Sequence, residues 1–217
     1  MRNYYWIPPL LWLFSQALPA ASDPAAGERL ARQGNQQGAT ACIGCHGADG
    51  GGNASAGFPA LAGLNADYLA RQLRDYRDDT RNNPIMKPIA SALSEQERQD
   101  VAAYYASLAP VRNDATAKDN APGQQLALRG DWENTIPACV SCHGPGGRGI
   151  DPDFPALAGQ HASYITAQLR AWREGKRRND DNGLMRVVAE RMTDVQIQAV
   201  ADYFAAAPVQ PDSGADR

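Results

Sequence analysis

The residues best suited to chemistry lie in two copies of one short motif. Residues 42–47 read Cys-Ile-Gly-Cys-His-Gly and residues 139–144 read Cys-Val-Ser-Cys-His-Gly, so together they use all four cysteines and two of the three histidines. A C-x-x-C-H motif is typical of covalent haem attachment, in which two thiols add to the vinyl groups and the adjacent histidine ligates the iron. The motifs therefore predict two covalently bound haem c groups, attached through Cys42, Cys45, Cys139 and Cys142.

Three other kinds of site can contain a C-x-x-C motif. A zinc site needs about four ligands, and one all-cysteine site would leave the repeated histidines and glycines unexplained. A thioredoxin-type redox motif follows a strand in a βαβ unit, and no such pattern surrounds either copy. Two disulfides are the remaining alternative for four cysteines in an exported chain. Haem attachment is the interpretation that accounts for the whole motif.

The repeat extends well beyond the two motifs. Phe-Pro-Ala-Leu-Ala-Gly occurs at residues 58–63 and again, letter for letter, at residues 154–159. A chain of 217 residues has room for two small domains, and a haem would supply much of the core of each. The sequence predicts a tandem duplication with a signal peptide at 1–22, an N-terminal domain at 23–112, a linker at 113–122 and a C-terminal domain at 123–217.

The first residues of the chain belong to neither repeat. Arg2 is followed by an apolar stretch from Tyr4 to about Leu18 and then by small residues up to Ser22, which is the pattern of a cleaved secretory signal peptide. The stretch is shorter than the roughly 20 apolar residues that span a bilayer, which disfavours the alternative of an uncleaved anchor. Export also fits haem attachment outside the cytoplasm, so we expect a mature protein in the periplasm.

Apolar and aromatic positions follow helical spacing in both halves, and no segment alternates as a strand would. We therefore expect an all-α fold in which each half has a central helix, beginning near Ala66 in the first half. One face of each central helix should point inward, and it carries Tyr68, Leu69, Gln72, Leu73 and Tyr76 in the first half and Tyr164, Ile165, Gln168, Leu169 and Trp172 in the second. Glycine-rich segments after each motif should wrap the loop around the haem edge. Capping boxes should start the last helix of each half, and short helices should open each half. The residues concerned are Ser94 with Glu97, Thr193 with Gln196, and Leu30 and Leu126 in the opening helices.

Few residues can supply the sixth ligand of each iron. Apart from the initiator, the methionines are Met86, Met185 and Met192, and the one histidine outside the motifs is His161. Repeat alignment places Met86 on Met185, whereas Met192 aligns with a leucine and His161 with an asparagine. We interpret Met192 as core packing and His161 as a surface residue near a helix start. The predicted ligand pairs are His46 with Met86 and His143 with Met185.

Ligation by His and Met would leave no open position on either iron, so we expect electron transfer and no enzymatic activity. A neutral thioether also favours reduced iron and raises the potential relative to two histidines. A ligating imidazole usually donates its other N–H to an oxygen, and the carbonyls of Pro59 and Pro155 suit that role. Arg81 and Arg177 precede the methionines and either pair with haem propionates or are solvated surface charges.

The doubled motif, the repeated Phe-Pro-Ala-Leu-Ala-Gly and a methionine before the last helix of each half make the chain resemble the cytochrome c4 family. The resemblance implies two class I cytochrome c domains related by a pseudo-twofold axis, with haem propionate edges facing each other. It also implies a periplasmic carrier in a respiratory chain, which takes electrons from a quinol-oxidising complex or another donor and delivers them to a haem-copper terminal oxidase. The segment 177–183 departs from the repeat, because it is longer and more charged than its counterpart.

Two alternatives use the same motifs. The protein could be the dihaem electron-accepting subunit of a dehydrogenase, as in flavocytochromes, or a dihaem peroxidase with one displaceable ligand. The formal net charge of −3 makes nucleic acid an improbable partner. Partners should therefore be redox proteins, and any association with a membrane should go through them.

Overall fold

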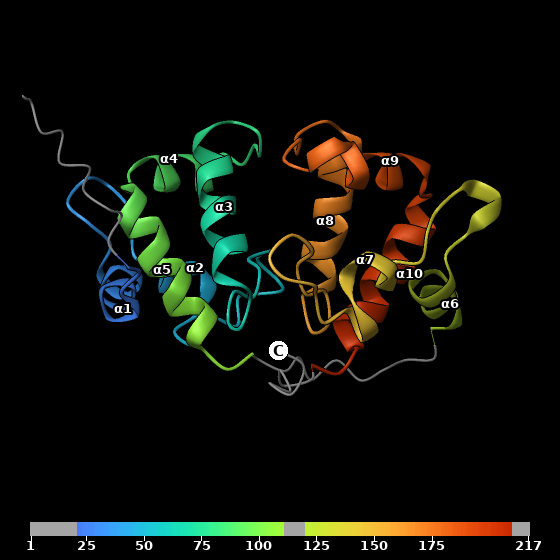
Figure 1. Cartoon of the computed structure of the whole chain (residues 1–217), viewed down its shortest axis with the longest axis horizontal. Coiled ribbons are helices and arrows are strands. Elements are labelled where there is room, and N and C mark those ends of the chain that lie inside the picture. The colour runs from blue at the N-terminus through green and yellow to red at the C-terminus, as the bar shows by residue number, and fades with distance from the viewer. Residues whose placement is uncertain (1–20, 111–119, 210–217) are drawn as a thin grey trace, which may run out of the picture.

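The computed structural model describes residues 21–110 and 120–209. Most of the predicted signal peptide and residues 111–119 of the connecting segment lie outside these ranges. The described part is helical, with isolated β-bridges but no strand, which confirms the all-α prediction. Figure 1 shows two similar halves side by side, with α3 (Ala66–Arg77) and α8 (Ala162–Arg173) facing each other at the centre. Within the described ranges, no helix is both long and apolar enough to cross a membrane.

The other helices of the N-terminal domain are α1 (Pro24–Gln33), α2 (Ile43–His46), α4 (Met86–Ser91) and α5 (Glu95–Ser107). The Asp23 side chain caps α1. The predicted capping box starts α5, because Ser94 Oγ accepts from the Glu97 amide and the Glu97 carboxylate accepts from the Ser94 amide. Helix α1 crosses α5 at Gly27, where a Cβ atom would lie 2.0 Å from the carbonyl oxygen of Asp100. Only glycine therefore fits at this helix crossing.

The C-terminal domain repeats this plan with α6 (Ala121–Arg129), α7 (Val140–His143), α9 (Leu184–Arg191), α10 (Asp194–Ala206) and the short 3₁₀ helices η1 (Trp132–Asn134), η2 (Pro145–Gly147) and η3 (Asp181–Gly183). Because α6 begins at Ala121, the last two residues of the predicted linker 113–122 are helical and belong to the domain. Asn120 fixes this start. Its side chain accepts from the Gly123 amide and donates to the Ala199 carbonyl of α10.

Each domain has its own apolar core, formed where its opening, central and last helices meet. The second predicted capping box is present at the start of α10, between Thr193 and Gln196. Met192 is 5% exposed and lies in the core of the C-terminal domain, as expected. The inward faces predicted for the central helices are confirmed by the burial of Tyr68, Leu69, Tyr76, Ile165, Leu169 and Trp172.

The domains also meet through the segments that follow α3 and α8. The Asn82 amide donates to the Lys176 carbonyl at 2.8 Å, and the Arg178 amide donates to the Thr80 carbonyl at 2.7 Å. These reciprocal bonds join the two segments in an antiparallel bridge, so the same part of each repeat lies on the domain boundary.

Candidate haem-binding sites

One helical turn places each attachment motif. The His46 amide donates to the Cys42 carbonyl and the His143 amide to the Cys139 carbonyl, both at 2.9 Å. This turn brings both cysteines and the histidine of each motif to the wall of one cavity. All four cysteines are free thiols, so neither disulfide of the alternative interpretation is formed. In the residues that the structure describes, no group of three or more His, Cys, Asp or Glu side chains could hold a bare metal ion.

The proline carbonyls predicted to accept from the two histidines do so. His46 Nδ1 lies 3.0 Å from the Pro59 carbonyl and His143 Nδ1 lies 2.8 Å from the Pro155 carbonyl. Burial lowers the pKa of both histidines, and the hydrogen bond to the proline carbonyl only partly opposes it. Each ring is therefore neutral at physiological pH. With Nδ1 as the donor, Nε2 is left as the nitrogen that can bind iron.

Glycine-rich loops hold these proline carbonyls in place. In the first domain the Gly52 amide donates to the His46 carbonyl at 2.8 Å, and the Leu61 amide donates to the Gly50 carbonyl at 2.7 Å. Gly50 and Gly52 both have positive φ, and a Cβ atom on Gly52 would lie 2.5 Å from the Phe58 carbonyl oxygen. The loop can fold back on the motif because glycine stands at the closest approach. The second domain repeats both bonds with its own glycines.

The predicted distal ligands lie on helices other than those of the attachment motifs. Met86 is the first residue of α4 and Met185 the second residue of α9. Both are partly exposed and line the same cavity as the attachment motifs. Met192 also reaches the cavity wall, but its repeat counterpart Leu93 is equally buried there, and a leucine cannot ligate iron. Met86 and Met185 therefore remain the equivalent candidates for the sixth ligand of the two irons.

The cavity has the chemistry that a pair of haems requires. It measures about 460 Å³, its wall is mainly apolar, and residues of both domains line it. Two buried polar atoms on residues of the wall, Trp172 Nε1 and Tyr105 Oη, have no hydrogen-bond partner among the described residues. Apolar walls would enclose the macrocycles, and such orphaned donors suit the polar edge of a bound group. When bound, each haem would supply an iron that cycles between ferrous and ferric states.

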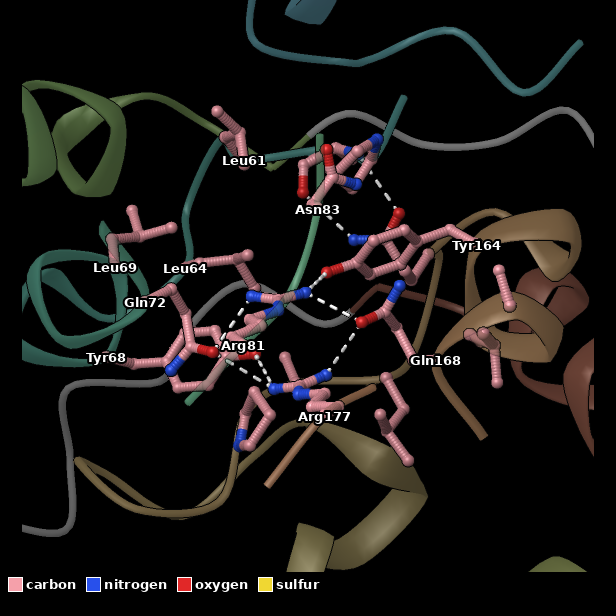
Figure 2. A pocket seen from close by; sticks show the side chains of 18 of the residues that line it. Leu61, Leu64, Tyr68, Leu69, Gln72, Arg81, Asn83, Tyr164, Gln168 and Arg177 are labelled. Atoms are coloured by element: carbon pink, nitrogen blue, oxygen red, sulfur yellow. Dashed lines mark hydrogen bonds between the residues drawn. The ribbon is translucent and has the colours of Figure 1, made fainter. Parts of the chain in front are cut away.

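Two arginines occupy the centre of the domain interface, as Figure 2 shows. Arg81 is 3% exposed and Arg177 is 5% exposed, so the solvated alternative for these residues is wrong. Arg81 donates to Gln72 of its own domain at 2.8 Å and to Gln168 of the other at 2.8 Å. Arg177 mirrors it, donating to Gln168 and Gln72 at 3.0 Å each. Each guanidinium therefore bonds to the glutamines of both central helices, and docking of the two domains buries both arginine charges.

This arginine pair makes the interface electropositive. In the described part of the chain, neither guanidinium forms an ion pair with a carboxylate. Burial raises the pKa of Tyr68, but the neighbouring charges of Arg177 and Arg81 outweigh it and hold that pKa below its usual value. Buried cations of this kind normally need anions. Haem propionates are the anions that these residues would hold.

Comparison with known proteins identifies the family. The cytochrome c profile matches residues 31–109 and 121–207, one match in each domain. The chain is 39% identical to cytochrome c4 of Thiocapsa roseopersicina over 190 residues, which cover 87% of this chain and 94% of the relative. The chain belongs to the cytochrome c4 family. It is accordingly a dihaem c-type electron-transfer protein with two covalently bound haem c groups.

Other members and relatives of this family are also similar. The "thiosulfate dehydrogenase electron acceptor" of Stutzerimonas stutzeri is 47% identical and covers 94% of this chain and 96% of its own. The protein of the same name from Thiomonas intermedia is 52% identical, over 82% of this chain and 83% of its own.

Two solved structures share the fold. Cytochrome c4 of Pseudomonas stutzeri has a TM-score of 0.76 at 32% identity, covering 87% of this chain and all of that one. The thiosulfate dehydrogenase TsdBA of Marichromatium purpuratum has a TM-score of 0.81 at 45% identity, covering 86% of this chain. Our chain spans 40% of that longer chain.

Within this cytochrome c4 fold, one set of polar residues at the domain interface was not predicted from the sequence. His161 is not a surface residue: it is 8% exposed, and its Nε2 lies 2.9 Å from the Gly51 carbonyl of the other domain. Beside it, Gln160 and Ser163 also bond to the N-terminal domain. The segment 177–183 likewise supplies Asn179, whose side chain donates to Gln72 and Asp75 across the boundary. The mismatch between His161 and the asparagine of the first repeat was the one signal of this role.

Proposed function

We propose that this protein is the dihaem electron acceptor of a thiosulfate-oxidising dehydrogenase. The observation that carries the proposal is the sequence identity of 47% and 52% to two proteins named as such acceptors. The cytochrome c4 of Thiocapsa roseopersicina is less similar, at 39%. The match to 40% of a thiosulfate dehydrogenase chain further supports a dihaem unit that works beside a dehydrogenase.

The geometry of the sites suits this role. Two attachment motifs with two sets of candidate axial ligands line one continuous cavity, so both sites open into a shared, mainly apolar space. Two one-electron sites can together take up the two electrons that an oxidation releases. Neutral histidines and thioethers as ligands favour the reduced state and so favour uptake. The residues thus support a receiver of electrons without a catalytic site of its own.

The proposal places the protein in the periplasm, following the signal-peptide pattern of residues 1–22. Onward delivery to a terminal oxidase, and uptake from a quinol-oxidising complex, stay predictions from the family resemblance. Docking to such partners would occur at the protein surface, so association with a membrane would be indirect.

The test is a rapid-mixing measurement on the oxidised, purified holoprotein. We expect fast reduction of both haems when thiosulfate and a purified thiosulfate dehydrogenase are present together, and no reduction by thiosulfate alone. A dehydrogenase that reduces an artificial dye but leaves this protein oxidised would refute the proposal. The absence of enzymatic activity is checked separately with hydrogen peroxide, whose consumption by the reduced protein would contradict it.

A further inference from the structure

One peptide group of the N-terminal domain forms hydrogen bonds with residues of both domains. The peptide between Pro59 and Ala60 offers its carbonyl to His46 Nδ1 at 3.0 Å. The N–H of the same peptide group donates to Gln160 Oε1 of the C-terminal domain at 3.0 Å. Gln160 Nε2 in turn donates to the Ala60 carbonyl at 2.9 Å. Gln160 is 6% exposed, so these bonds form away from bulk water.

This arrangement links Gln160 to the proximal histidine electronically as well as sterically. Resonance couples the N–H and C=O of a peptide group, so an acceptor at the N–H increases the negative charge on the carbonyl oxygen. Hydrogen bonds in such a chain polarise one another, and a low dielectric strengthens the effect. The Pro59 oxygen therefore becomes a better acceptor for His46 Nδ1–H. A stronger bond at Nδ1 makes Nε2 a more basic ligand.

The second domain lacks the corresponding link. Repeat alignment places Leu64 opposite Gln160, and a leucine side chain has no hydrogen-bond acceptor. The equivalent peptide group lies between Pro155 and Ala156, and its N–H donates to no other described residue. His143 still bonds to the Pro155 carbonyl at 2.8 Å. The two sites thus share the attachment motif and the proline acceptor, but only in the first does a cross-domain bond among the described residues reach the peptide group that holds the histidine.

We propose that Gln160 is a positioning residue through which the C-terminal domain tunes the haem site of the N-terminal domain. It acts through the Pro59–Ala60 peptide on His46, without contact with the ligand itself. A more basic Nε2 stabilises the higher charge of ferric iron, so Gln160 lowers the reduction potential of the first site. The second site has no such partner, and its potential is independent of Leu64.

The test compares Gln160→Met with a control that affects docking alone. Methionine keeps the length of the side chain but removes the acceptor for the Ala60 amide. Ser163→Ala removes another cross-domain bond, from Ser163 Oγ to the Ala54 carbonyl at 2.8 Å, without touching that peptide group. Both potentials are measured by spectroelectrochemical titration, and NMR follows the His46 Nδ1 proton.

In Gln160→Met we expect the potential of the first site to rise, the second to stay unchanged and the His46 Nδ1 proton to move upfield as its bond weakens. Ser163→Ala should change neither potential. Equal shifts in both variants, or an unchanged first site in a folded Gln160→Met protein, would overturn the proposal. Gln160→Glu is a second check, because either protonation state keeps an oxygen at the Ala60 amide. A rise of the first potential in that variant would contradict the mechanism.

Discussion

Replacing Met86 or Met185 by alanine tests the axial ligands one site at a time. Each methionine lies at the start of a short helix, on the wall of the haem cavity and in a separate domain. A neutral thioether favours the reduced iron. Each substitution should therefore lower the potential of one site and leave the other unchanged, because the second ligand set lies in the other domain.

The size of the effect separates ligation from packing. Axial ligands set haem potentials over a range of about 0.8 V, so loss of a thioether should lower the potential by at least about 0.1 V, which equals roughly 2.3 kcal/mol for one electron. Met192 is the matched control, since it also lines the cavity and is 5% exposed in the core. Met192→Ala should cost about 2–5 kcal/mol of unfolding free energy with both potentials nearly unchanged.

The assay combines spectroelectrochemical titration with optical detection of the methionine-to-ferric-iron charge-transfer band in the far red. Met86→Ala and Met185→Ala should each remove about half of that band and shift one of two titration waves. A variant that keeps the full band and both waves would refute the assignment of that methionine. Loss of half the band in Met192→Ala instead of Met185→Ala would show that repeat alignment had selected the wrong residue in the second domain.

Three further predictions concern the parts that position the sites. Gly27→Ala should destabilise the N-terminal domain in thermal unfolding, because the new Cβ would lie 2.0 Å from a backbone oxygen. The cost of overpacking, about 1–3 kcal/mol, exceeds the gain in helix propensity of about 1 kcal/mol. The control is Gly44→Ser, because a Cβ at Gly44 would meet open space. Arg81→Met should lower both potentials by on the order of 1 kcal/mol per electron, since it removes a buried positive charge shared by the two domains; a shift in one site alone would contradict this. Burial raises the pKa of Glu97, but the hydrogen bonds from Ser94 and Asn35 and the charge of Arg98 together outweigh this and lower the pKa. The stabilisation of α5 by Glu97 is therefore present above the unfolded value of about 4.3 and lost as the pH falls through the lower folded value. Hydrogen exchange should show less acid-dependent opening of α5 in Glu97→Gln, with α10 unchanged.

Local features and scarce residue types made much of the fold predictable from sequence. A capping box depends on residues three positions apart, so Ser94 with Glu97 could be recognised without knowledge of the tertiary structure. The proline carbonyls follow their histidines by 13 residues in the first repeat and 12 in the second, and this similar spacing made Pro59 and Pro155 predictable as acceptors. Only three methionines follow the initiator, so alignment of two repeats was enough to select a pair.

The domain interface was not predictable in the same way. Arg81, Arg177 and His161 are polar residues in polar stretches, and such residues are usually exposed. Their burial depends on contacts between the domains. Alignment of the two repeats shows only which position of one domain corresponds to which position of the other. Gln72 and Gln168 stood on the predicted inward faces, yet their common acceptor role for two arginines appears only when α3 and α8 are placed together.

Departures from the repeat are therefore the most informative positions for function in a duplicated electron carrier. Exact duplication would give two sites of equal potential, with no preferred position for a single electron. A difference in potential between the two sites has to come from residues that the repeats do not share. Such a residue changes the potential when it contacts the group that is hydrogen-bonded to an iron ligand. Gln160 opposite Leu64 meets both conditions, since it contacts the peptide group that holds His46. Gln160 also bonds to the N-terminal domain, so one residue contributes both to docking and to the difference between the sites.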